Sequence, residues 1–148
     1  MEESIRILND LIRVSEDGKK GFTESAERAE DLELKTLFTE RAAGCAEAGR
    51  ELQQLVQTLG GKPAGDEGSV AGAAHRGWVK LKSVVGDKDV NVLEEVERGE
   101  DYAKAQYMKA LKADLLPSVR GIVERQYRGV IANHDRVKEL RERFRATA

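Results

Sequence analysis

The chain repeats one plan twice: a long amphipathic segment, a tight joint and a second long amphipathic segment. The first copy spans residues 4–59 with its joint at Asp31, and the second spans residues 89–145 with its joint at Leu116-Pro117. In both copies apolar residues recur at alternating spacings of three and four, which is typical of amphipathic helices with one buried face. The repeat therefore predicts two helical hairpins that pack into one bundle.

Residues that cap or break helices set the ends of four expected helices. Asp31 can cap a helix, because its carboxylate accepts hydrogen bonds from free first-turn amides. Gly60-Gly61 can end that helix in the left-handed conformation, and Pro117 suits a first helical position. The helices are expected at about 3–29, 32–59, 89–112 and 117–145. No strand pattern appears, so the sequence predicts an all-α four-helix bundle with one domain over residues 1–148.

A long connection separates the two hairpins. Residues 60–88 begin with a glycine-rich loop and continue with a short helix at about 70–85. Such a crossover is long enough to return the chain along the bundle. His75 and Trp78 lie on the short helix. Trp78 is expected to pin that helix to the bundle, and a ligand pocket beside Trp78 is the alternative.

Composition narrows the classes of function. Charged residues make up 35% of the chain and aromatic residues 5%, which suits helices with solvated outer faces. The formal charge of −2 argues against a nucleic-acid or anionic-membrane binder. The single cysteine excludes an internal disulfide and fits a reducing compartment. With no apolar run for a signal peptide or membrane span, the expected location is the cytoplasm.

Several polar residues interrupt the apolar stripes near mid-bundle. Glu100 lies seven residues from both Leu93 and Tyr107, so the three are expected to share a face. On the other helices, the interrupting candidates are Lys19, Arg41, Cys45 and His134.

These residues allow two interpretations. A buried carboxylate that faces a histidine can ligate a metal ion. Alternatively, Glu100 pairs with Lys19 or Arg41 and His134 is satisfied by hydrogen bonds, since unpaired buried polar groups are costly. Cys45 is expected to be a small buried filler.

Five stretches carry a resemblance that covers nearly the whole chain. They are LNDLI at 8–12, DGKKGF at 17–22, LKTLF at 34–38, GSVAGAAHRGW at 68–78 and ERGED at 97–101. Together with the duplicated helix pair, they resemble an uncharacterised bacterial family of ferritin-like four-helix-bundle proteins. The GSVAGAAHRGW stretch is the most specific part. The resemblance implies a ferritin-like fold and no settled activity.

The wider superfamily uses six metal ligands: a Glu on each of two helices and Glu-x-x-His on each of the other two. Carried over to this chain, the resemblance keeps only Glu100 and His134. The other four positions hold Lys19, Cys45, Ala48 and Ile131. A carboxylate-bridged di-iron centre needs several anionic oxygens, so the resemblance implies a di-iron site that is largely lost.

Two functional hypotheses follow from the sequence. The first is a non-enzymatic bundle without a cofactor that acts through self-association, for example as a homodimer, or through a protein partner. The second is a metal-binding protein in iron handling or oxidative-stress response. In that case Glu100 and His134 would hold a single iron, manganese or zinc ion.

Overall fold

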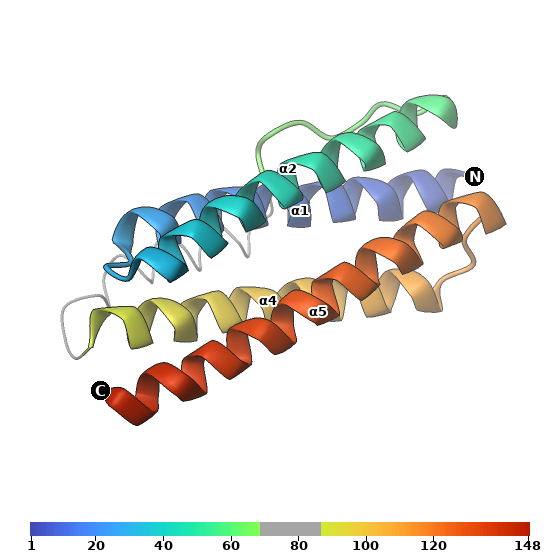
Figure 1. Ribbon diagram of the computed structural model, residues 1–148. Coiled ribbons are helices and arrows are strands. Elements are labelled where there is room, and N and C mark those ends of the chain that lie inside the picture. The colour runs from blue at the N-terminus through green and yellow to red at the C-terminus, as the bar shows by residue number, and fades with distance from the viewer. Residues whose placement is uncertain (69–86) are drawn as a thin grey trace.

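The computed structural model of the protein describes residues 1–68 and 87–148, and these residues fold into the predicted helices (Figure 1). The helices are α1 (Glu2–Arg28), α2 (Leu32–Thr58), α4 (Lys88–Lys112) and α5 (Pro117–Thr147). No strand occurs in the described parts of the chain. The all-α four-helix bundle built from two hairpins is therefore confirmed. The predicted short helix with His75 and Trp78 lies outside the described residues.

The two hairpins lie against each other through α1 and α4. In each hairpin the two helices run in opposite directions, α1 beside α2 and α4 beside α5 (Figure 1). α2 ends at the opposite end of the bundle from the start of α4 (Figure 1). The N-terminus lies at the end where α4 joins α5, and the C-terminus lies at the other end.

Hydrogen bonds to aspartate define the joint of the first hairpin. The Asp31 carboxylate accepts from the Leu34 amide at 3.2 Å and caps α2 as predicted. Asp89, in the first turn of α4, accepts from the amides of Glu30 at 2.7 Å and Asp31 at 3.0 Å. The start of the second hairpin is thus tied to the turn of the first.

The buried apolar residues form two separate clusters, one toward each end of the bundle. The cluster near the α4–α5 joint, here called the first cluster, contains Ile7, Leu8, Leu11, Ile12, Val14, Leu52, Val56, Ala64, Tyr107, Ala110, Leu115, Val119 and Val123. The second cluster contains Phe22, Ala29, Leu34, Phe38, Val92, Leu93, Val96, Val137 and Leu140. All four described helices contribute residues to these clusters. None of the helices in residues 1–68 and 87–148 is long and apolar enough to cross a membrane.

Glycines in this fold have opposite roles, which gives a first prediction. Gly121 lies inside α5, and a Cβ built there meets nothing within 4 Å. Gly121→Ala should therefore raise the free energy of unfolding by about 0.5–1 kcal/mol, because alanine loses less backbone freedom in a helix.

Gly60 ends α2 with φ of 81°. Gly60→Ala should lower the free energy of unfolding by about 1 kcal/mol, since that conformation is strained for a residue with a side chain. Urea unfolding measures both, and equal effects would contradict the assignment of the α2 end.

Candidate functional site

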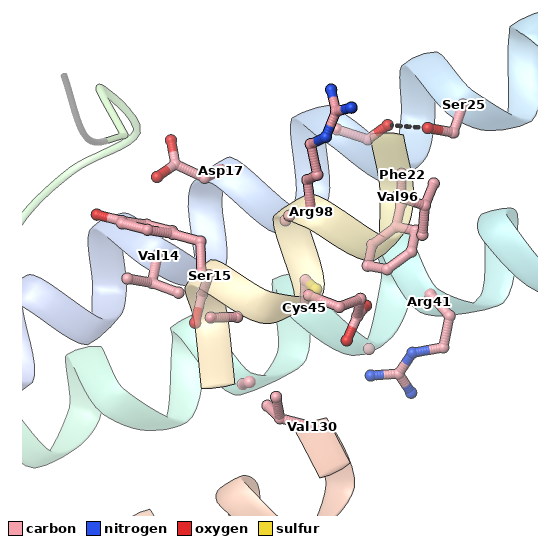
Figure 2. A pocket seen from close by; sticks show the side chains of 18 of the residues that line it. Val14, Ser15, Asp17, Phe22, Ser25, Arg41, Cys45, Val96, Arg98 and Val130 are labelled. Atoms are coloured by element: carbon pink, nitrogen blue, oxygen red, sulfur yellow. Dashed lines mark hydrogen bonds between the residues drawn. The ribbon is translucent and has the colours of Figure 1, made fainter. Parts of the chain in front are cut away.

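A cavity of about 510 Å³ lies between the two apolar clusters, at mid-bundle. Residues from all four described helices line it, including Phe22 of α1, Cys45 of α2, Val96 of α4 and Val130 of α5 (Figure 2). Its lining is largely apolar. The helices leave this volume because small residues gather at one level, namely Gly18, Gly21, Gly44, Cys45, Ala48, Gly99, Ala103 and Gly129.

Glu100 is the most buried acidic side chain of the cavity wall, with 6% of its surface exposed. Asn133 Nδ2 donates to Glu100 Oε1 at 2.5 Å. Burial raises the pKa of Glu100 to about 7, and the positive charge of Arg41 works against this rise. Glu97, nearly one turn earlier on α4, pairs with Arg141 at 2.5 Å.

Arg41 is half-buried on α2 and lines the same cavity, where Figure 2 shows its guanidinium group. The guanidinium lies over Gly44, with Nη1 at 3.4 Å from the position that a Cβ would take there. Its Nε is buried and has no hydrogen-bond partner in the described part of the chain. Arg41 and Glu100 thus face one cavity, yet no ion pair or hydrogen bond recorded for residues 1–68 and 87–148 joins them.

Cys45 of α2 packs against Gly18 of α1. A Cβ on Gly18 would stand 2.7 Å from Cys45 Sγ, so the sulfur occupies space that the glycine leaves free. Burial raises the pKa of the Cys45 thiol to about 12. The thiol is therefore neutral at physiological pH, as a filling side chain would be.

A buried polar chain closes the cavity toward the first cluster. The Tyr107 hydroxyl donates to Gln126 Oε1 at 2.7 Å, and Gln126 Nε2 donates to Glu51 Oε1 at 2.7 Å. Arg125 also pairs with Glu51. Burial raises the pKa of the Tyr107 hydroxyl above its ordinary value, so the group acts as a neutral donor.

Side-chain bonds join α2 to α5 on both sides of the cavity. The Glu51–Arg125 pair lies toward the first cluster. Glu33 pairs with Arg136 at 3.7 Å, and also with Arg143, toward the second cluster. Between these pairs Gln126 Nε2 donates to the Ala48 carbonyl oxygen at 3.3 Å, and beyond that bond Gly44 of α2 and Gly129 of α5 line the cavity. A Cβ on Gly129 would meet nothing within 4 Å. α2 and α5 approach each other less closely than α1 and α4 do, and the stretch around Gly44 and Gly129 is here called the α2–α5 window.

The predicted position of Lys19 in the bundle interior is wrong. Its side chain is 50% exposed and lies 3.9 Å from Glu16 on the same helix surface. Ser15, Gly18 and Phe22 of α1 line the cavity instead. Lys19 is one residue past Gly18, which turns it about 100° around the helix. It therefore does not pair with Glu100.

His134 also lies beside the predicted position. Its Nε2 is 2.5 Å from Asp101 at the edge of the α4–α5 interface, and the side chain is 13% exposed. The inward position belongs to Asn133, which the sequence analysis missed. Asn133 lies seven residues after Gln126 and four before Val137, so the stricter three-and-four repeat of α5 identifies it.

The residues around Glu100 do not fit a carboxylate-bridged pair of metal ions. Within residues 1–68 and 87–148 no group of three or more His, Cys, Asp or Glu side chains could hold a metal ion. The groups near Glu100 are the Asn133 amide, the neutral Cys45 thiol, the Arg41 cation and the Asp101–His134 pair, whose members bond to each other. Such a set lacks the anionic oxygens that two dications need.

Comparisons with known proteins agree with the fold and give no activity. A family model described as "Domain of unknown function (DUF2383)" matches residues 3–113. No curated protein matches the sequence. A solved two-domain protein from Anabaena variabilis ATCC 29413, with DJ-1/ThiJ/PfpI-like and ferritin-like domains, is similar with a TM-score of 0.76 and 17% identity. The likeness covers 97% of this chain and 37% of that one, so this chain spans little more than a third of it. The structural likeness shows the ferritin-like fold, and by the family match the chain belongs to the DUF2383 family.

Proposed function

We propose that this protein is a non-enzymatic binding protein that holds a small, largely apolar molecule in its central cavity. The observation that carries the proposal is the cavity itself, about 510 Å³ in volume and placed between the two apolar clusters. Ligand pockets commonly measure about 300–1,000 Å³ and combine apolar walls with a few polar groups. Here Glu100 and Arg41 are two of the polar groups of the wall, and Glu100 is buried.

The volume itself supports a ligand. Protein interiors are normally packed as tightly as organic crystals. A large void removes dispersion contacts from every atom of its wall and lowers stability. A bound apolar molecule would restore those contacts.

The chemistry of the wall supports binding over catalysis. The Cys45 thiol is neutral, so it is a poor nucleophile. The Tyr107 hydroxyl is hydrogen bonded to Gln126. Among the described residues, the only histidine is His134, which bonds to Asp101 and is not part of the cavity wall. Glu100, whose pKa is about 7, is too weak a base to deprotonate a thiol whose pKa is about 12, so the cavity holds no activated thiolate.

Blocking the cavity tests this function. Ala103 lines the cavity and Ala105, two residues along α4, is exposed. The probes are 4-phenylbutyrate, 4-phenylbutanol and 4-phenylbutylamine, which share one apolar body. We expect at least one probe to bind the wild type and Ala105→Trp equally in calorimetric titration. Ala103→Trp should bind it at least about tenfold more weakly, because the indole takes up part of the space that the apolar body needs. Failure of all three probes, or equal binding to both variants, would refute the proposal.

Two earlier hypotheses stay predictions. One is the homo-oligomer or protein partner, which sedimentation velocity tests. The other is the single ion at Glu100 and His134. Elemental analysis of purified protein, with Glu100→Ala and His134→Ala as variants, tests it.

A further inference from the structure

The polar part of the cavity wall is unevenly satisfied. Glu100 Oε1 accepts from Asn133, and this is the one hydrogen bond that residues 1–68 and 87–148 make to the carboxyl group. Among the described residues, Arg41 has fewer hydrogen-bond partners than Glu100. Its buried Nε has no acceptor, and its guanidinium forms no ion pair in the described part of the chain. A half-buried guanidinium without an anionic partner is unfavourable, and arginine cannot relieve this by losing its proton.

We propose, building on the cavity as a ligand site, that its ligand is an apolar monocarboxylate whose carboxylate pairs with Arg41 and lies between Arg41 and Glu100. The planar guanidinium presents paired donors that match a carboxylate in two parallel hydrogen bonds. The apolar body of the ligand then fills the volume lined by Phe22, Val96 and Val130.

The charge of Arg41 favours an anion over a cation, because the other ionised side chains of the cavity wall balance in number: Asp17, Glu24 and Glu95 against Arg28, Arg98 and Arg125. An amine would meet the fixed charge of Arg41, whereas a carboxylate neutralises it. Glu100 does not oppose the anion strongly, because burial raises its pKa to about 7 and its carboxyl group can be neutral. In that form it donates a hydrogen bond to the carboxylate oxygen that faces it. The other groups near Glu100 are Asp101 and His134, which bond to each other, and the neutral Cys45.

The α2–α5 window gives such a ligand a way in. Arg41 lies on α2 one turn before Gly44, so the guanidinium stands beside the window. A carboxylate that enters between Gly44 and Gly129 would reach Arg41 first. The apolar body would follow into the interior, where it is removed from water.

The test compares the three phenyl probes on the wild type, Arg41→Gln and Arg50→Gln. Arg50 is an exposed arginine of the same helix and does not line the cavity, so it is the matched control. We expect 4-phenylbutyrate to bind the wild type and Arg50→Gln at least about tenfold more tightly than the alcohol or the amine. Arg41→Gln should weaken the acid by roughly tenfold to a hundredfold, as for a lost charge-assisted hydrogen bond. It should leave the alcohol unchanged, which also shows that the variant is folded. Glu100→Gln should keep or tighten acid binding.

Other outcomes separate this inference from the function on which it rests. If the alcohol binds as well as the acid, or the amine binds best and Glu100→Gln abolishes its binding, the carboxylate assignment is overturned while the cavity remains a binding site. If acid binding is the same in Arg41→Gln and Arg50→Gln, Arg41 is not the anchor. If no probe binds any variant, the proposed function itself fails.

Discussion

Glu100→Gln should make the protein more stable at pH 8 by about 3 kcal/mol and change its stability little near pH 4.5. Glu100 is only 6% exposed, and burial raises the pKa of its carboxyl group from 4.5 to about 7. Between these values the folded protein binds more protons than the unfolded chain. The free energy of unfolding therefore falls as pH rises, by about 1.4 kcal/mol per pH unit. Glutamine keeps the acceptor for Asn133 and carries no proton to lose, so this penalty disappears.

Urea unfolding at half-unit steps from pH 4.5 to 8 measures the effect. The variant should lack the part of the slope that Glu100 contributes, and the two curves should run parallel above about pH 8. Glu139→Gln is the control, because Glu139 is an exposed side chain of the neighbouring helix α5. Equal pH profiles for the wild type and Glu100→Gln would show that the carboxyl group is solvated in the folded state.

Phe38→Ala should destabilise the protein by about 3–5 kcal/mol, the usual cost of truncating a fully buried phenylalanine. Phe38 has no exposed surface, and its ring packs against Phe22 with centroids 6.1 Å apart. The loss removes a large share of the 5–15 kcal/mol that typically holds a domain together. The cost arises because α1 and α2 are held in place by their other contacts and cannot close onto the space.

The matched control is Phe144→Ala, at the partly exposed edge of the same cluster. It should cost less than half as much, since less apolar surface returns to water. Urea unfolding of both variants gives the comparison. A cost below about 1 kcal/mol for Phe38→Ala would mean that the second cluster is not closely packed.

The helices were largely predictable from the sequence because their ends carry local chemical signals. Asp31, Gly60 and Pro117 act through their own backbone and cap geometry, so no knowledge of the tertiary structure is needed. The observed bounds of α2 and α5 start at the residues that the sequence predicts, Leu32 and Pro117. The burial of Glu100 was predictable because Glu100 lies seven residues from both Leu93 and Tyr107, which are themselves buried.

The candidate site was less predictable, because one residue decides which side of a helix a group occupies. The sequence pattern predicted that Lys19 and His134 face inward. The residues that do so are their neighbours in the sequence, Gly18 and Asn133. The cavity left no direct signal in the sequence. It results from small residues on four helices that meet at one level, and that level is fixed only when the helices are packed.

The division of the apolar interior into two clusters affects how a guest molecule could move. Each cluster holds one end of the bundle and does not depend on residues that line the α2–α5 window, such as Gly44 and Gly129. The middle parts of α2 and α5 can therefore bend away from each other while the packed clusters keep both ends of the helices in place. Exchange of the contents would then require the local separation of two helices and no unfolding of either end.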